Sequence, residues 1–394
     1  MATKTTRAGR GHGFTQVLEW SAYKHKLLSN YLHVWCYKLG AFNHELAFVD
    51  TCAGAGKYED EKDGSPLIAA KFNGEKAMVQ RGTGITVYAF ETDGDIYPQL
   101  VTNLAPYTAP KPPRAHVSNT SFFENPRPVL DATREVPTLF LIDPFGTVAV
   151  TKDHLHPLLT HADRASTEVL VRIDPTMLAR FAGWVRRQSR SSTPVPCAAS
   201  FARLLERLNI DTEQIAEEGS LEGWGLQQDK YELLEQYLRL YTNRFHYVQV
   251  VPIRASYQAA PKYMLVHGSD SAHGAAHLND CVSTLEDRLF TATYERRERE
   301  TGQGSLFGPP QRAPRYSEAD LDAQTFAFLE ACGGDMEFIE LRAGLAMHFG
   351  PDFREKHHRG AVKRLIEAGR VESLGGGAAP ESDTILRVRR IRRR

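Results

Sequence analysis

Residues 48–60 (FVDTCAGAGKYED) place a carboxylate directly before two glycines, at the end of an apolar run. Asp50 closes the run, and Gly54 and Gly56 follow in a short loop. Glycine at such positions allows positive φ and a close approach of the backbone to a ligand. Tyr58 stands where a phosphate-binding P-loop has Ser or Thr, so the ligand is not expected to be held as a P-loop holds its phosphates.

A second carboxylate ends the next apolar run, ITVYAFE (85–91). Glu91 in that place can accept hydrogen bonds from the hydroxyls of an unphosphorylated ribose. Asn119, which closes RAHVSN (114–119), is expected at the same site. An acid before a Gly-x-Gly loop fits S-adenosylmethionine, whose ammonium group Asp50 would bind. The alternative for both acids is a helix N-cap or a solvated strand end.

The segment FLIDPFG (140–146) resembles the (Asp/Asn)-Pro-Pro-aromatic motif of amino-group methyltransferases. In that motif an acid or amide and a proline-held carbonyl accept the two protons of an exocyclic amine, which aims the nitrogen lone pair at the methyl donor. Asp143 and Pro144 match, and Phe145 replaces the second proline and is expected to contact the base. Gly146 stands where the stacking aromatic should be, and a strand that ends in a proline turn is the alternative.

Three further polar residues have local explanations. In GSPLIAA (64–70), Ser65 is expected as the N-cap and Pro66 as the first residue of a helix. Lys24 and His25 lie on an amphipathic helix and are most simply part of a solvated face.

The elements that must position these residues are short apolar runs separated by helical stretches. Runs that are apolar throughout are typical of strands buried on both faces, and their alternation with helices predicts a parallel sheet covered on both sides. Ligands bind beyond the carboxyl ends of such strands. Two late runs, 245–255 and 262–268, are joined too closely for a helical crossover and are expected to pair as a hairpin. The parallel runs are 46–50, 85–91, 114–119, 138–143 and 167–174.

This layout predicts a class I methyltransferase-like, Rossmann-type α/β domain over residues 1–300. A helical insertion at about 175–243 would overhang the strand ends. Residues 301–316 are rich in Gly and Pro and indicate a linker. Helices followed by a β-hairpin in 317–394 indicate a winged-helix-like domain with a basic tail.

Composition limits the class of protein. Lys+Arg and Asp+Glu are both 48, and 42% of residues are hydrophobic, so the chain is neither disordered nor uniformly charged. Residues 354–394 hold 12 Lys/Arg against 5 Asp/Glu, a local charge of +7. Contact with nucleic acid and a solvated tail are the two alternatives for this charge. Five cysteines without a CxxC pair, and histidines without ligand spacing, predict no metal site. The sequence shows neither a signal peptide nor an apolar run long enough for a membrane span, so a cytoplasmic protein is expected.

Several motifs together resemble the three-Cys-motif partner family of bacterial proteins over about residues 15–310. The resemblance implies a methyltransferase-like fold and a neighbouring partner protein with three cysteines, similar to radical S-adenosylmethionine enzymes. The matching segments are the helix Lys24–Trp35, FVDTCAGAGKYED, GSPLIAAKF, FLIDPFG, TEVLVRID continuing to Arg180, KYMLVHGSDSAHG and GQGSLFG.

A more distant resemblance, carried by Asp50–Tyr58 and Gly64–Ile68, is to the large-subunit ribosomal RNA adenine amino-group methyltransferase. It implies that the cofactor lies at Asp50, Gly54 and Gly56, with its ribose on Glu91. It further implies that Lys24, Tyr58, Ser65 and Pro66 line the site.

Three functions follow as hypotheses. The first is an S-adenosylmethionine-dependent methyltransferase that acts on a base amine of RNA or DNA. The second is a catalytically inert methyltransferase-like subunit that binds nucleic acid or the three-cysteine protein. The third, a nuclease or other hydrolase, would need clustered metal-binding carboxylates, whereas the strand-end acids are already explained by the cofactor.

Overall fold

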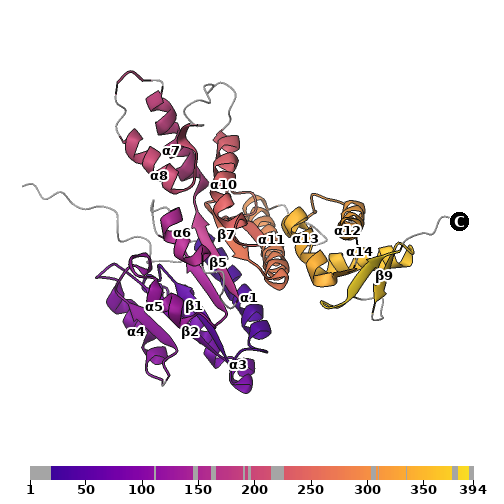
Figure 1. Ribbon diagram of the computed structural model, residues 1–394, viewed down its shortest axis with the longest axis horizontal. Coiled ribbons are helices and arrows are strands. Elements are labelled where there is room, and N and C mark those ends of the chain that lie inside the picture. The colour runs from indigo at the N-terminus through magenta and orange to yellow at the C-terminus, as the bar shows by residue number, and fades with distance from the viewer. Residues whose placement is uncertain are drawn as a thin grey trace, which may run out of the picture. The chain divides into compact units, whose positions relative to one another are not determined.

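The structure, a computed structural model, forms two compact units (Figure 1). The first is Met1–Leu240 with Lys262–Leu265, and the second is Tyr241–Pro261 with Val266–Arg394. The residues that it describes are 19–110, 112–144, 150–160, 166–189, 191–193, 197–213, 226–302, 308, 310–333, 335–374 and 380–389.

A seven-stranded, mostly parallel sheet has the strand order β3-β2-β1-β4-β5-β7-β6. Strands β1 to β5 pair in parallel, and β6 and β7 are neighbours at the end of the order. This order confirms the predicted class I methyltransferase-like, Rossmann-type fold. The bounds are β1 Glu45–Asp50, β2 Gly84–Phe90, β3 Ala115–Ser118, β4 Thr138–Ile142, β5 Thr167–Ile173, β6 Tyr247–Ile253 and β7 Tyr263–Ser269.

Strands β1, β2, β4 and β5 are buried along nearly their whole length, which explains why their sequences are mostly apolar rather than alternating. Helix α1 (Glu19–Leu39) buries Leu28, Leu32 and Trp35, and its Tyr31 hydroxyl donates to the buried Glu168 carboxylate of β5. The other helices of this part are α2 Ser65–Lys71, η1 Phe72–Gly74, α3 Lys76–Arg81, α4 Tyr97–Thr108, η2 Phe122–Glu124, α5 Arg127–Ala132 and α6 Lys152–Leu159.

The predicted insertion is helical where the structure describes it. Helix α7 (Pro175–Ser189) packs on α8 (Ala198–Arg207), and α10 (Leu226–Thr242) follows. Figure 1 shows α7 and α8 together beyond the end of β5. Asp174 accepts from the backbone N–H of Thr176 at 2.9 Å and so caps α7 directly after the strand.

The second unit contains a long helix, α11 (Ala272–Thr301), and a small three-stranded sheet of order β8-β10-β9. The C-terminal part has helices followed by a β-hairpin, as the sequence predicted, and a short strand β8 that it did not. The bounds are α12 Glu318–Cys332, β8 Asp335–Glu337, α13 Phe338–Phe349, η3 Gly350–Asp352, α14 Glu355–Glu367, β9 Val371–Leu374 and β10 Ile385–Val388.

Helix α11 is tied closely to the C-terminal helices. Arg342 of α13 donates to Asp280 of α11 at 2.7 Å, and Asn279 donates to the Phe353 carbonyl at 2.7 Å. Arg312 joins Asp287 at 2.8 Å to the Pro351 carbonyl at 2.7 Å. These bonds explain why α11 belongs to the same compact unit as residues 317–394. The predicted division of the chain at 301–316 stays a prediction.

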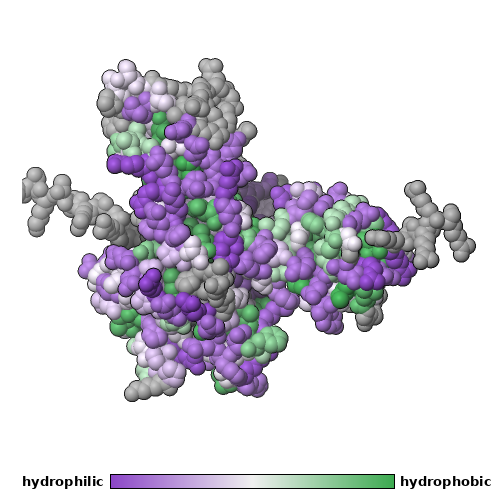
Figure 2. Space-filling view, in the orientation of Figure 1, coloured by the Kyte–Doolittle hydropathy of each residue, from purple (hydrophilic) through white to green (hydrophobic). Residues whose placement is uncertain are grey.

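The face shown in Figure 2 is mostly hydrophilic, with hydrophobic residues in small separate groups. None of the described helices has both the length and the apolar character that crossing a membrane requires.

Candidate active site

Four polar residues follow four neighbouring strands at the same edge of the sheet. Asn119, Glu91, Asp50 and Asp143 stand at the carboxyl ends of β3, β2, β1 and β4, which is the order of these strands in the sheet. Neighbouring strands of a sheet lie about 4.8 Å apart. The fold therefore brings together residues that are up to 93 positions apart in the sequence (50 to 143).

The loop after β1 is shaped by its glycines. Gly54 and Gly56 have φ of 60° and 74°, the left-handed region that glycine adopts readily. A Cβ on Gly56 would lie 3.0 Å from Leu100 Cδ1. The Gly64 N–H donates to the Gly56 carbonyl at 2.8 Å and holds the loop against the start of α2. The loop is therefore fixed in a conformation that other residues would strain.

Asp50 is fully buried at the end of β1. Its carboxylate accepts from the Cys52 N–H at 3.2 Å and from the Ser65 hydroxyl at 2.5 Å. Burial raises the pKa of Asp50 to about 6, and these two hydrogen bonds oppose the rise. Asp50 is thus ionised at neutral pH and protonated in mild acid.

The predicted capping role of Ser65 is wrong. Gly64 is the N-cap of α2, and Ser65 is the first residue of the helix, with its side chain turned to Asp50. The reason is that a carboxylate buried at a strand end needs donors, and the hydroxyl supplies one that the backbone does not.

Glu91 and Asn119 lie farther along the same edge. Glu91 is 9% exposed, and its Oε1 accepts from the Asp93 N–H at 2.7 Å. Within the described part of the chain its Oε2 has no partner. Asn119 is exposed at the end of β3. One carboxylate oxygen of Glu91 is therefore available to a ligand.

Asp143 forms the centre of a buried charge cluster. It is 5% exposed and forms an ion pair with Lys24 through Oδ2. Arg172 Nη1 lies 3.4 Å from Asp143 Oδ1 and 3.3 Å from the Pro144 carbonyl oxygen. Burial raises the pKa of Asp143, but the charges of Lys24 and Arg172 outweigh burial and hold this pKa below its ordinary value. Asp143 is therefore a carboxylate and a poor proton acceptor at neutral pH.

The interpretation of Lys24 and His25 as a solvated face is wrong. Their exposed fractions are 7% and 8%, because this turn of α1 packs over the strand ends. Burial lowers the pKa of Lys24, but the charge of Asp143 reverses this and raises it. Burial, with the charge of Lys24, lowers the pKa of His25 to about 3, so its imidazole is neutral. The His25 and Tyr58 rings are 5.4 Å apart.

Sequence reasoning missed Arg172 and Tyr263. The Arg172 guanidinium lies 4.4 Å from the centroid of the Tyr263 ring, and this ring is 3% exposed. The available signal was an arginine between two apolar residues, Val171 and Ile173, near the end of a predicted strand. Phe145 lies outside the described residues, so its contact with a base stays a prediction.

A small cavity of about 20 Å³ joins the loop, α1 and Asp143, which is room for about one water molecule. Five of the residues expected at the site line it, namely Lys24, Gly56, Tyr58, Ser65 and Asp143. Its lining is Lys24, His25, Cys52, Ala53, Gly56, Lys57, Tyr58, Gly64, Ser65 and Asp143.

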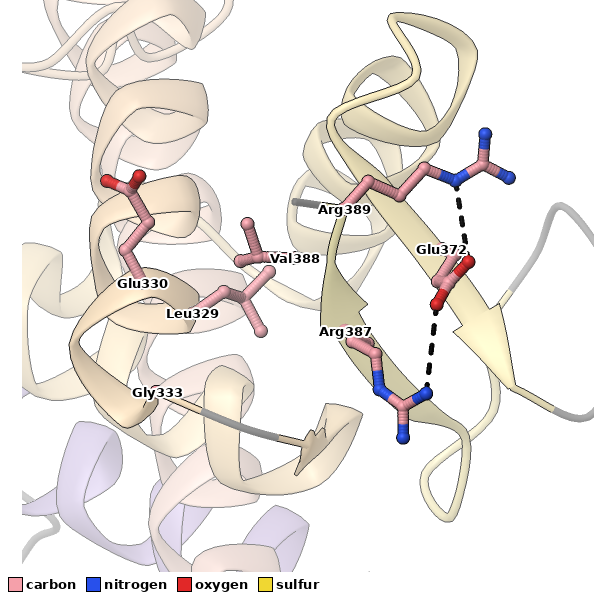
Figure 3. Close-up of a pocket in the computed structure, with 7 residues that line it drawn as sticks. All are labelled: Leu329, Glu330, Gly333, Glu372, Arg387, Val388 and Arg389. Carbon is pink, nitrogen blue, oxygen red and sulfur yellow. Dashed lines mark ion pairs between the residues drawn. The ribbon is translucent and has the colours of Figure 1, made fainter. Parts of the chain in front are cut away.

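A much larger hollow of about 700 Å³ lies in the second unit, between α12 and the β9–β10 hairpin (Figure 3). Its cations are neutralised, because Arg387 and Arg389 lie 3.9 Å and 3.5 Å from Glu372 oxygens. Arg387 also pairs with Asp335, with Nη2 2.7 Å from Oδ2. The large volume of this hollow is therefore no evidence of a catalytic site. The candidate active site lies at the carboxyl ends of β1 to β4.

Among the residues that the structure describes, no three His, Cys, Asp or Glu side chains are grouped as metal ligands would be.

No protein-family model and no curated protein matches this chain. Solved structures with partly similar backbones include protein LPL1258 from Legionella pneumophila strain Philadelphia 1, at 12% identity and a TM-score of 0.39, over 69% of this chain and 93% of that one. Another is the plantazolicin methyltransferase BamL in complex with a triazolic desmethylPZN analog and SAH, at 10% identity and a TM-score of 0.28, over 64% and 85%.

A third is a cyclopropane-fatty-acyl-phospholipid synthase-like protein from Lactobacillus casei ATCC 334, at 11% identity and a TM-score of 0.26, over 65% and 95% of the two chains. Likenesses of this size carry no functional argument. The order of the strands supports the methyltransferase-like fold independently of them.

Proposed function

We propose that this protein is an S-adenosylmethionine-dependent methyltransferase that acts on an amine of a nucleic-acid base. The observation that carries the proposal is the set of Asp50, the positive-φ glycine loop and Glu91 across two neighbouring strand ends. The open Oε2 of Glu91 suits a ribose hydroxyl, and the buried Asp50 carboxylate suits an ammonium group. When bound, the cofactor would supply an electrophilic methyl group.

Asp143 and the Pro144 carbonyl would orient the target amine. Arg172 Nη1 lies within 3.4 Å of both acceptors, so its guanidinium occupies the position that an amine with two N–H groups needs. The substrate amine must displace it, and Tyr263, on whose ring the guanidinium stacks, can keep it nearby. Since the nucleophile is a neutral nitrogen lone pair, the low pKa of Asp143 suits orientation rather than proton removal.

A second candidate is an inert methyltransferase-like subunit that binds nucleic acid or a three-Cys-motif protein. One observation favours it: Lys24 and Arg172 already hold both oxygens of Asp143, in a site with only about 20 Å³ of space.

Calorimetric titration with S-adenosylmethionine separates these functions. We expect micromolar binding by the full-length protein, and a loss of at least about tenfold in Glu91→Ala, because a charge-assisted hydrogen bond from Oε2 to the ribose is removed. Glu91→Gln keeps an acceptor for the Asp93 N–H, and Glu75→Ala changes an exposed acid of the same unit and should bind normally. No binding at millimolar cofactor would reject the lone-enzyme hypothesis, whereas binding that is insensitive to Glu91 would reject this site. A labelled-methyl screen over RNA and DNA follows.

Binding of the cofactor should weaken in mild acid. Asp50 must be ionised to bind an ammonium group, and its pKa is raised to about 6, so affinity should fall by about tenfold per pH unit below pH 6. The hydrogen bond from Ser65 lowers this pKa, so Ser65→Ala should move the midpoint to higher pH. Titrations between pH 5 and 7 measure both effects, with Ser192→Ala, on an exposed bend, as the matched control. If the midpoint pH is the same in Ser65→Ala as in the wild type, Asp50 is not the group whose ionisation controls cofactor binding.

A further inference from the structure

Helix α7 has an exposed face of four residues, Arg180, Gly183, Trp184 and Arg187, here called the α7 stripe. Their spacing is i, i+3, i+4 and i+7, which places them on one side of the helix. The opposite side is buried and includes Leu178. Trp184 is 38% exposed and is the one exposed tryptophan in the described part of the chain.

The α7 stripe is positively charged. Helix α7 contains three arginines and neither Asp nor Glu. Among the described residues neither Arg180 nor Arg187 has a carboxylate partner, in contrast to Arg387 and Arg389 of the second unit, which pair with Glu372. Arg187 Cζ lies 5.3 Å from the centroid of the Trp184 ring. The stripe therefore combines an aromatic ring with two arginines that have no carboxylate partner among the described residues.

The indole ring is supported from below. Phe181 and Phe201 stack at 4.5 Å and 15° between α7 and α8, and the Phe201 ring lies 6.2 Å from that of Trp184. Next to the indole, a Cβ added to Gly183 would meet nothing within 4 Å. The surface beside Trp184 is thus open at Gly183, and a planar group that stacks on the indole would take the place of the Arg187 guanidinium.

The helix is anchored to the candidate active site. It begins one residue after Asp174, which caps it and follows β5 directly. Arg172 of the same strand contacts Asp143 and the Pro144 carbonyl. At 1.5 Å per residue, Arg180 lies about 9 Å along the chain from the cap, and Arg187 about 10 Å beyond Arg180.

We propose that the α7 stripe binds single-stranded nucleic acid, with a base stacked on Trp184 and phosphates contacted by Arg180 and Arg187. Stacking on an aromatic ring beside cations is how sequence-tolerant proteins hold single strands, whereas a duplex hides the faces of its bases. The inference rests on the proposed function, because the single-stranded nucleic acid bound by the α7 stripe would be the substrate whose base enters the candidate active site at the carboxyl ends of the β-strands.

The test is fluorescence anisotropy of the full-length protein with a labelled 12-nucleotide oligouridine, the same length of oligothymidine, and a duplex. We expect both single strands to bind more tightly than the duplex. Trp184→Ala should weaken binding by about tenfold. The double variant Arg180→Gln/Arg187→Gln should lower the slope of log K against log salt by about 1.4, from two phosphate contacts. Phe42→Ala and Arg299→Gln, both exposed, are the controls, and equal melting temperatures exclude misfolding.

The proposal is overturned if the wild type binds none of these probes, if it prefers the duplex, or if the stripe variants bind like the controls. It is also overturned if polyglutamate competes with the same dependence on Trp184, which would indicate an acidic protein partner. Failure of the proposed function is a separate result. If the protein binds oligouridine through the α7 stripe but does not bind S-adenosylmethionine, the nucleic-acid site is supported and the methyltransferase activity is rejected.

Discussion

Asp143→Ala should reduce methyl transfer by about 100-fold or more, while affinity for S-adenosylmethionine stays within a few-fold of the wild type. Asp143 contacts Lys24 and Arg172 and makes no bond to the loop after β1. Under the proposed function, its loss would remove the acceptor that orients the target nitrogen. Single-turnover transfer of a labelled methyl group, with calorimetry on the same samples, measures the two effects.

The variant Asp143→Asn distinguishes two roles of Asp143, as a hydrogen-bond acceptor that orients the amine or as a general base. The amide oxygen still accepts from an amine but cannot take up a proton at neutral pH, so an orienting role predicts that about a tenth of the activity remains. A catalytic base would lose as much activity in Asn as in Ala. Asp131→Asn changes an exposed acid of α5 and should leave the rate unchanged. Wild-type activity in Asp143→Ala would end the catalytic assignment.

Lys24→Met should destabilise the protein by about 3–5 kcal/mol, because it leaves a buried carboxylate without its closer cation. The two side chains are only 9% and 6% exposed, and the remaining partner, Arg172 at 3.4 Å, is at the edge of hydrogen-bonding distance. Urea unfolding at pH 7 measures the change in the free energy of unfolding. The variant should also fail in methyl transfer, since Lys24 holds Asp143 in its ionised form.

A double variant identifies the cause of the loss. Lys24→Met/Asp143→Leu removes both charges and should recover most of the lost stability, since a buried pair can be replaced by apolar groups at little cost. Lys71→Met breaks the exposed pair with Asp63 and should cost less than about 1 kcal/mol. If Lys24→Met costs no more than Lys71→Met, the buried pair is not formed in solution.

The α7 stripe is exposed, whereas Asp143 is buried and already paired with Lys24 and Arg172, so binding of the nucleic acid to the stripe would come first. A nucleic-acid strand held on α7 would be tethered before its base competes with Arg172 for Asp143 and the Pro144 carbonyl. Under this order, stripe variants should raise KM with little change in kcat, whereas Asp143 variants should lower kcat.

Much of the framework could be predicted because it depends on local pattern. Apolar runs that end in a polar residue indicate strands buried on both faces, and parallel strands place their carboxyl ends at one edge. This reasoning predicts that Asp50, Glu91, Asn119 and Asp143 lie side by side at one edge of the sheet. Gly54 and Gly56 could likewise be read as positions of positive φ, because conformational freedom is a property of the residue itself.

The charge cluster could not be predicted in this way. Whether Lys24 faces water or the sheet depends on how α1 rotates against the strand ends, and helical spacing alone is compatible with both. Arg172 contacts Asp143, 29 residues away in the sequence, and Ser65 contacts Asp50, 15 residues away. These contacts exist only in the packed fold.

The sequence by itself therefore determined the order of elements and the edge at which chemistry is possible, because these follow from periodicity and backbone preference. Only the tertiary structure decided which charges are buried together, that Asp143 is held by Lys24 and Arg172, and that Trp184 faces solvent. The physical reason is that burial and pairing are collective. The energy of a charge depends on all the atoms that exclude water from it, and those atoms come from distant parts of the chain.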